Sequence, residues 1–279
     1  MARRARLDAE LVRRRLARSR QHAAELIADG RVLLDGSRAS KAATQLDPAQ
    51  ALRVLEPADG AAEYASRGGH KLAGALDALG SLAPRVAGRH ALDAGASTGG
   101  FTDVLLRRGA RSVVAVDVGY GQLVWSLRND ERVLVMDRTN VRSLRPEDVQ
   151  PPVNLVVGDL SFISLTLVLP ALRSVATPEA DLLLMVKPQF EVGKERLGSG
   201  GVVRDTALHA DAVHTVVAAA AELGLGLRAA VASPLPGPSG NVEYFVHLHA
   251  GPGADTESTI AHAIATGPAG AAAATGGTP

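Results

Sequence analysis

From residue 89 onward, short apolar runs alternate with amphipathic segments, and this alternation constrains the fold more than any other feature of the chain. The apolar runs predict strands at 90–94, 112–117, 132–136, 153–158, 181–186, 227–232 and 241–248. Helices are predicted before and between them, at 69–79, 99–108, 121–129, 164–176 and 205–224. Continuous apolar strands separated by helices are typical of an α/β protein, in which helices cover both faces of a buried parallel sheet.

The last two predicted strands are connected differently from the others. Only a Pro- and Gly-rich turn, residues 234–240, lies between them, whereas a parallel pair needs a long crossover. These two strands should therefore be antiparallel. A mostly parallel seven-stranded sheet with a terminal antiparallel hairpin is the architecture of Rossmann-like class I methyltransferases rather than of dinucleotide oxidoreductases.

A glycine-rich loop follows the first of these strands. Glycines between a strand and a helix let the backbone approach a ligand closely, and this position is the ligand crevice of open α/β sheets. The spacing fits neither the dinucleotide pattern G-x-G-x-x-G nor a phosphate-binding loop. It resembles the first motif of S-adenosylmethionine-dependent methyltransferases. The candidate cofactor-binding residues of this loop are Asp93, Gly95, Ala96, Ser97, Thr98, Gly99 and Gly100.

Two more carboxylates are predicted to end strands at the same rim. Asp117 follows Gly95 by 22 residues and could accept hydrogen bonds from both ribose hydroxyls of an adenosyl group. Asp137 ends the next strand and could meet the adenine amino group. The alternative is a tight structural turn with capping acids, which leaves three carboxylates at strand ends unexplained.

Four further ionisable residues are candidates for catalysis. Lys71 begins the helix before the first strand, and Asp159 and Lys187 follow the apolar runs 153–158 and 181–186. Glu243 lies in the last strand. Singly, Asp159 could cap a helix and Glu243 could be a surface residue. The chain has 26 Arg and only four Lys, however, so the presence of two of the four lysines in this set needs an explanation. Lys187 also directly follows an apolar core strand, where an ionisable group needs a partner or a function.

The N-terminal 60 residues form a separate basic head. They contain 12 Arg or Lys against eight acids, while residues 61–279 contain 18 against 21. Two short helices within 7–28, with Asp8 and Ser19 as caps, and strands around Asp35-Gly36 are predicted. This arrangement resembles the S4 RNA-binding domain, a small α+β module. The resemblance implies phosphate contacts by the arginines near the helix junction, which are Arg6, Arg13, Arg14, Arg15, Arg18 and Arg20.

The order Lys71, Asp159, Lys187, Glu243 resembles the Lys-Asp-Lys-Glu tetrad of FtsJ-type ribose 2′-O-methyltransferases. The whole chain from about residue 3 to 250 resembles the TlyA family, whose members are often labelled hemolysins. The matching segments are 66–72, 93–102, 117–123, 159–164, 186–191, 233–234 and 243–244.

The resemblance implies 2′-O-methylation of cytidines in rRNA, with S-adenosylmethionine as the cofactor. The family's long form acts on both the 16S RNA of 30S subunits and the 23S RNA of 50S subunits, and residues 5–8 are similar to that form. The modification is implied to sensitise bacteria to capreomycin. Lys187 is the expected general base, because a lysine can lose its proton and an arginine cannot. The like charge of Lys71 favours this loss, and the acids Asp159 and Glu243 oppose it. The glycine-rich segment 193–201 is a candidate RNA lid.

The expected domains are an S4-like domain at 1–60, a linker at 61–67, a methyltransferase domain at 68–250 and a disordered tail at 251–279. The chain has no Cys, which excludes disulfides and a thiol nucleophile, and no metal site is expected. No apolar segment nears the ~18 residues of a membrane helix, so a cytoplasmic protein without a membrane partner is expected. The rival interpretations are a non-catalytic S4 protein and a pore-forming hemolysin.

Overall fold

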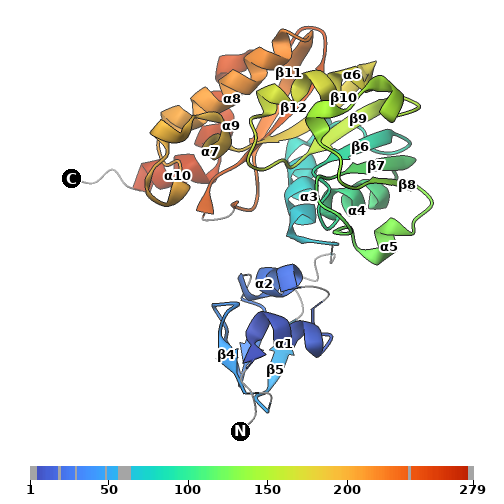
Figure 1. The fold of residues 1–279 in the computed structure, drawn as a ribbon. Coiled ribbons are helices and arrows are strands. Elements are labelled where there is room, and N and C mark those ends of the chain that lie inside the picture. The colour runs from blue at the N-terminus through green and yellow to red at the C-terminus, as the bar shows by residue number, and fades with distance from the viewer. Residues whose placement is uncertain are drawn as a thin grey trace. The chain divides into compact units, whose positions relative to one another are not determined.

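The computed structural model describes residues 5–17, 20–28, 30–47, 49–55, 64–237 and 240–275 (Figure 1). The chain divides into two compact units, Met1–Arg67 and Gly68–Pro279. The expected linker at 61–67 falls partly outside the described residues, since these begin again at residue 64.

The N-terminal unit packs two helices on small sheets. Its elements are β1 (Ala5–Arg6), α1 (Leu7–Arg13), α2 (Arg20–Ala28), β2 (Val32–Leu34), β3 (Ser37–Arg38), β4 (Gln45–Leu46) and β5 (Leu52–Val54). Leu7 and Leu11 of α1 pack with Leu26 and Ile27 of α2 in one apolar core. The α1 cap was predicted wrongly: Arg6 occupies the N-cap, and Asp8 is the second residue of the helix. The predicted cap Ser19 lies outside the described residues.

The C-terminal unit is built on one seven-stranded sheet, in the order β11-β12-β10-β9-β6-β7-β8. Its strands are β6 (His90–Ala94), β7 (Ser112–Val116), β8 (Val133–Met136), β9 (Val153–Gly158), β10 (Ala176–Val186), β11 (Leu225–Ala232) and β12 (Tyr244–Ala250). The pairs among β8, β7, β6, β9 and β10 are parallel, and β12 runs antiparallel to both β10 and β11. The predicted sheet and its antiparallel hairpin are thereby confirmed.

Helices lie on both faces of this sheet (Figure 1). They are α3 (Arg67–Leu79), α4 (Gly100–Arg107), α5 (Trp125–Arg128), α6 (Leu169–Ser174), α7 (Pro188–Glu191), α8 (Thr206–Ala221), α9 (Thr256–Ala265) and α10 (Pro268–Thr275). Alternate strand residues face opposite sides. Leu92 and Leu184 pack in the core that contains Val213 of α8, whereas Phe101 of α4 stacks on Phe245 of β12, with ring centroids 6.0 Å apart.

Short 3-10 turns connect several of these elements. They are η1 (Gly80–Leu82), η2 (Val141–Ser143), η3 (Pro146–Asp148), η4 (Leu165–Leu167), η5 (Lys194–Arg196) and η6 (Ser199–Gly201). The helix predicted at 164–176 is replaced by η4 and the short α6, and the one predicted at 121–129 shortens to α5. No helix among the described residues is long and apolar enough to cross a membrane.

The prediction of a disordered tail at 251–279 is wrong for most of that segment. Residues 256–265 form α9 and residues 268–275 form α10, while 276–279 lie outside the described part of the chain. Ile260, Ala263 and Ile264 recur at helical spacing and are buried in the main core, where α9 contacts β11. The Gly, Ala and Thr content of the segment concealed this short apolar stripe, because alanine contributes little to a hydrophobic pattern.

Candidate active site

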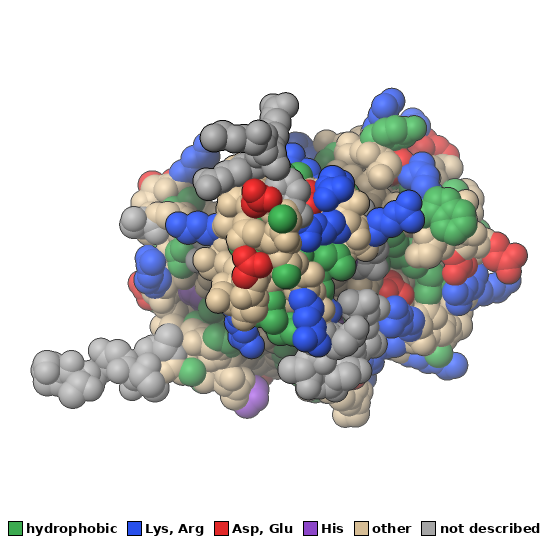
Figure 2. Space-filling model, turned by 90° about the horizontal axis from the view of Figure 1, so that it is seen from below, with side chains coloured by type: hydrophobic (Ala, Val, Ile, Leu, Met, Phe, Trp, Pro, Cys, Tyr) green, Lys and Arg blue, Asp and Glu red, His purple; other side chains and the backbone are tan. Residues whose placement is uncertain are grey.

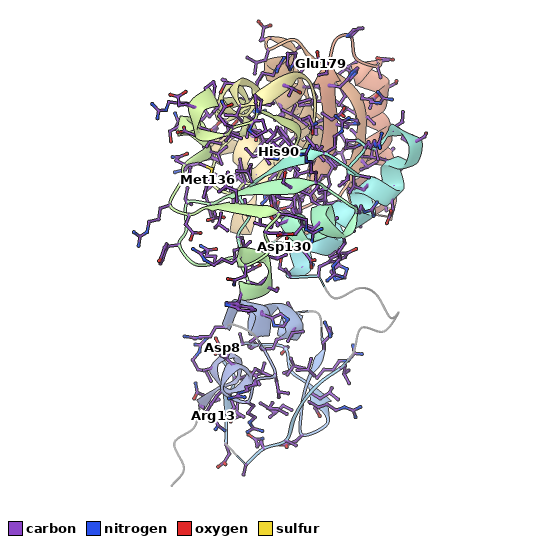
Figure 3. The ribbon with its side chains drawn as sticks, turned by 90° about the vertical axis from the view of Figure 1, so that its right-hand side faces the viewer. Asp8, Arg13, His90, Asp130, Met136 and Glu179 are labelled. Atoms are coloured by element: carbon purple, nitrogen blue, oxygen red, sulfur yellow. The ribbon has the colours of Figure 1, made fainter. Side chains whose placement is uncertain are left out.

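Several of the predicted site residues lie at the carboxyl ends of the parallel strands. In Figure 3, the label His90 marks the amino end of strand β6, and the label Met136 marks the carboxyl end of strand β8. Asp159 directly follows β9 and Lys187 directly follows β10, while Glu243 directly precedes the antiparallel β12. All three therefore lie at one rim, which is the ligand crevice of such sheets.

Strand register makes these residues neighbours. Val186 is paired with Tyr244, so Lys187 and Glu243, one residue further on each strand, adjoin across the β10–β12 pair. Gly158 is paired with both Ala94 and Leu184, so Asp159 lies between the loop after β6 and the end of β10. The catalytic candidates therefore adjoin the glycine-rich loop.

Lys187 forms an ion pair with Asp159. Its Nζ lies 2.6 Å from Asp159 Oδ1, and it donates a hydrogen bond of 2.8 Å to Ser161 Oγ. The contact with Asp159 is close but lacks the angle of a hydrogen bond, and Oδ1 has no other polar partner among the described residues. Only 6% of the Lys187 side chain is exposed to solvent.

Lys71 forms the second ion pair, with Glu243. Lys71 Nζ donates to Glu243 Oε2 over 2.6 Å and lies 4.0 Å from the sulfur of Met185. Lys71 reaches the strand end from α3, which explains how a residue so early in the chain joins the site. Glu243 is fully buried, and its Oε1 has no hydrogen-bond partner among the residues described. The four candidates thus form two adjacent lysine–carboxylate pairs.

The loop after β6 has the backbone that its glycines allow. Gly95 and Gly99 have φ values of +85° and +100°, in the left-handed region that favours glycine. A Cβ on Gly99 would come within 2.4 Å of the Leu127 side chain, and one on Gly95 within 2.9 Å of the Asp159 carbonyl oxygen. The loop can therefore take this path beside Asp159 only with glycine at these positions.

Asp93 is a buried carboxyl group at the end of β6. It is fully buried, and Thr102 of α4 donates a 2.7 Å hydrogen bond to its Oδ2. Burial raises the pKa of Asp93 to about 7, against the opposing hydrogen bond from Thr102. Its Oδ1 accepts no hydrogen bond from the described residues, and a buried acceptor in this state suits a cationic or hydrogen-bonding ligand group.

Asp117 accepts hydrogen bonds from the backbone of the glycine-rich loop and of the segment that follows β7. Its two oxygens accept backbone hydrogen bonds from Ser97 and Gly119, of 2.8 and 2.7 Å. Each carboxylate oxygen has a second lone pair, which leaves acceptor capacity for ribose hydroxyls. Ser97 also donates to Gln122 over 3.3 Å, and Gln122 was not among the predicted residues.

Asp137 is held by protein groups in the structure. Its Oδ2 accepts hydrogen bonds from Arg128, at 2.8 Å, and from the Gly121 amide, at 3.2 Å. Burial acts to raise the pKa of Asp137, but these hydrogen bonds outweigh it and the pKa is lowered. Contact with an adenine amino group would have to use the other oxygen, so this role stays a prediction.

The segment after Asp159 and helix α7 contain groups that were not predicted as site residues. Glu191 of α7 accepts hydrogen bonds from the Leu165 amide, at 2.8 Å, and from Ser164 Oγ, at 2.5 Å, which ties the loop after β10 to the loop after β9. Burial raises the pKa of Glu191 despite these bonds. Phe162 has a φ of +63° and is 91% exposed, and its ring lies 5.2 Å from that of Phe190.

The candidate lid at 193–201 contains η5 and η6 and is anchored where it ends. Asn241 accepts from the Val203 amide and donates to the Gly201 carbonyl, both at 3.1 Å. His209 of α8 contacts the Val203 carbonyl and the Tyr244 hydroxyl. Burial lowers the pKa of His209, so the ring is neutral at pH 7, donating to the carbonyl and accepting from the hydroxyl. The lid's end is therefore tied to the residues on either side of Glu243.

The arginines of the N-terminal unit are organised by two buried acids. Asp8 pairs with Arg6 and Arg20, at 3.0 and 2.9 Å, and Glu10 pairs with Arg13 and Arg14, at 2.6 and 2.7 Å. The hydrogen bond from Arg6 lowers the pKa of Asp8, and that from Arg13 lowers the pKa of Glu10 to about 2. Figure 3 labels Asp8 and Arg13, and Figure 2 shows Lys and Arg side chains, in blue, scattered over the face it draws.

The other two arginines of the predicted set, Arg15 and Arg18, are not among those that pair with Asp8 or Glu10 in the described residues. Arg15 is exposed and has a φ of +60° in the turn after α1, and Arg18 lies outside the described residues. Among the four paired arginines, Arg13 and Arg20 keep 65% and 60% of their side chains exposed, and Arg14 only 22%. The acids fix the guanidinium groups and leave the side chains of Arg13 and Arg20 largely exposed, an arrangement suited to contacts with phosphates.

Comparison with known proteins matches both units. Residues 64–250 match the family model of FtsJ-like methyltransferases, and residues 5–51 match that of the S4 domain. A protein of Mycobacterium tuberculosis named 16S/23S rRNA (cytidine-2′-O)-methyltransferase TlyA is 61% identical over 248 residues, which cover 89% of this chain and 91% of that protein.

More distant relatives extend the match. A Campylobacter jejuni protein named 23S rRNA (cytidine-2′-O)-methyltransferase TlyA is 34% identical, over 85% of this chain and 96% of that protein. A solved structure described as a candidate hemolysin from Streptococcus thermophilus superposes with a TM-score of 0.72 at 36% identity, covering 94% of this chain and 96% of that one.

The fold and the site define an enzyme of the S-adenosylmethionine-dependent methyltransferase class, of FtsJ-like type, with an S4 domain at its N-terminus. The chain belongs to the TlyA family.

Proposed function

We propose that this protein transfers a methyl group from S-adenosylmethionine to the ribose 2′-hydroxyl of cytidine in the 16S RNA of 30S subunits and the 23S RNA of 50S subunits, in the cytoplasm. The observation that carries the proposal is the pair of buried lysine–carboxylate contacts beside the glycine-rich loop. The Mycobacterium relative, named for both RNAs, supports two substrates, whereas the Campylobacter relative is named for the 23S RNA alone.

The cofactor fits the acceptors present at this rim. S-adenosylmethionine, when bound, supplies a methyl group on a positively charged sulfonium. Asp117 would hold the ribose hydroxyls with its remaining lone pairs, and the free Oδ1 of Asp93 would face a donor of the cofactor. Gly95 and Gly99 would let the loop backbone lie against it.

Lys187 is the residue best placed to take the proton of the 2′-hydroxyl. A ribose hydroxyl is a poor nucleophile until its proton has an acceptor, and the amine of Lys187 becomes one once it has released its own proton. The pairing of Lys71 with Glu243 changes the electrostatics expected from sequence. Because Glu243 compensates the charge of Lys71, Lys71 repels the Lys187 amine less than a lone ammonium would.

The S4 domain would dock the enzyme on structured RNA through the arginines fixed by Asp8 and Glu10. Such contacts give affinity that depends steeply on salt and carry little sequence information. Choice of the target cytidine is then left to the rim of the methyltransferase domain and to the shape of the RNA.

The test is transfer of a radiolabelled methyl group from S-adenosylmethionine to unmodified 30S and 50S subunits. We expect labelling of both. Lys187→Arg keeps the charge but cannot accept a proton, so it should lose at least ~100-fold in single-turnover rate. Lys71→Arg should be milder. No labelling by the wild-type enzyme would overturn the proposed function, and near-normal turnover by Lys187→Arg would overturn its role as base.

A further inference from the structure

Among the described residues, Lys187 Nζ makes one hydrogen bond of good geometry, and its partner, Ser161, lies outside the two lysine–carboxylate pairs. Ser161 Oγ accepts a 2.8 Å hydrogen bond from Lys187 Nζ, whereas the 2.6 Å contact of Asp159 Oδ1 lacks hydrogen-bond geometry. An amine at the end of four methylene groups can rotate freely, and an ion pair constrains that rotation weakly. The orientation of the Lys187 amine therefore depends on Ser161.

The geometry of an amine makes this orientation important. A neutral lysine amine has two N–H bonds and one lone pair in three staggered positions around Nζ. Ser161 Oγ takes one N–H, and Asp159 Oδ1 attracts the second by its charge. The lone pair then occupies the third position, which neither side chain covers. It is available to the proton of a substrate hydroxyl.

The loop that carries Ser161 is fixed on its far side. Glu191 binds the Ser164 hydroxyl and the Leu165 amide, which fastens the segment after Ser161 to the helix that follows Lys187. Phe162, next to Ser161, has a φ of +63°, a backbone conformation that is rare for an aromatic residue. A conformation of this kind persists only where the surroundings hold it, and the Phe162–Phe190 contact is part of that hold.

We propose that Ser161 is a positioning residue for the methyl transfer: its hydroxyl orients the Lys187 amine so that the lone pair meets the 2′-hydroxyl of the target nucleotide. This rests on the proposed function. In the step itself, the 2′-O–H bond breaks and its proton passes to Lys187 Nζ. The oxygen forms a bond to the methyl carbon as the sulfur–methyl bond breaks, and the electron pair of that bond stays on sulfur.

The test compares Ser161→Ala and Ser161→Thr in single-turnover methyl transfer to ribosomal subunits at saturating S-adenosylmethionine. We expect Ser161→Ala to lose about tenfold or more in rate, the scale of one hydrogen bond that acts in the transition state. Cofactor affinity, measured by calorimetry, should change less than about twofold, since Ser161 acts on Lys187 alone. Ser161→Thr keeps a hydroxyl and should recover most of the rate.

The pH dependence of the rate separates positioning from simple loop damage. An oxygen that accepts a hydrogen bond from Nζ stabilises the charged amine more than the neutral one. The rising limb of the pH–rate profile should therefore move to lower pH in Ser161→Ala, while its plateau falls. Ser174→Ala is the matched control, because the Ser174 hydroxyl, at the exposed end of α6, donates among the described residues only to the Ala171 carbonyl.

The outcomes separate this inference from the proposed function. If the wild-type enzyme methylates subunits and Ser161→Ala matches it in rate and pH profile, the inference is overturned and the function stands. Equal losses in Ser161→Ala and Ser161→Thr would also overturn it, because the hydroxyl would then not matter. A wild-type enzyme without activity would overturn the proposed function itself.

Discussion

Lys71 and Glu243 form an ion pair of 2.6 Å that is almost completely removed from solvent, although 172 residues separate them in the chain. Removing one partner of a buried pair leaves an uncompensated charge and costs about 3–5 kcal/mol, whereas replacing both by apolar residues is often neutral. Lys71→Met should therefore lower the thermal unfolding midpoint strongly. Lys71→Met/Glu243→Leu should recover most of that loss.

Activity should respond differently from stability in this pair. The double variant lacks both groups at the rim, so its methyl-transfer rate should stay low even where its unfolding midpoint is near that of the wild type. The measurement is a thermal melt with a parallel transfer assay. A double variant as unstable as Lys71→Met would show that the pair contributes more than mutual charge compensation.

The raised pKa of Asp93 leads us to expect a specific pH dependence of the protein's stability. Its pKa in the folded protein is raised by burial to about 7, above its usual value of 3.8. Between these two pH values the unfolded chain ionises at this site and the folded protein does not, so the contribution of Asp93 to stability falls as pH rises to about 7 and is constant beyond it. Below the ordinary value both states are protonated and the contribution is unchanged.

The variant Asp93→Asn removes this titration and can still accept the hydrogen bond from Thr102. The difference in thermal unfolding midpoint, variant minus wild type, is measured without cofactor at several pH values. This difference should increase as the pH rises from about 4.5 to 7 and should be constant above that. Asp211→Asn, on an exposed carboxylate of α8, is the control and should show no such trend. A flat difference for Asp93→Asn would mean that the buried carboxyl is not held neutral.

Asp117→Ala should weaken S-adenosylmethionine binding. Loss of a charge-assisted hydrogen bond costs about 1.5–3 kcal/mol, or roughly 10- to 150-fold in affinity. The Ser97 and Gly119 amides also lose their acceptor, so the effect should lie toward the upper end. Titration calorimetry measures it, and RNA affinity should be nearly unchanged. Unaltered cofactor affinity would remove Asp117 from the binding site.

Arg20→Ala should weaken binding to ribosomal subunits and make it less dependent on salt. If Arg20 contacts one phosphate, the slope of log affinity against log salt should decrease by about one. Arg145→Ala is a control in the other unit, where Arg145 is engaged by Glu147 and Asp148. An unchanged slope in Arg20→Ala would show that Arg20 only pairs with Asp8.

The sheet could be predicted from sequence because apolar strand runs are a strong periodic signal. The positions of Asp159, Lys187 and Glu243 followed from that, since strand ends converge at one rim. The pairing could not be predicted, because it depends on how α3 brings Lys71 to Glu243 rather than to Asp159. Ser161 lies in the matching segment 159–164 but was not predicted as a site residue, since a serine in a loop indicates no role until its distance to Lys187 is known. The α9 stripe was too short and too rich in alanine to stand out.

The most direct test of the central claim is the chemical position of the transferred methyl group. Unmodified 30S and 50S subunits are incubated with the enzyme and S-adenosylmethionine, and the RNA is digested to nucleosides for mass spectrometry. The account predicts one new product, cytidine with the added methyl on the ribose 2′-oxygen, and its absence with Lys187→Arg. A methyl group on the base, or on a nucleoside other than cytidine, would contradict it.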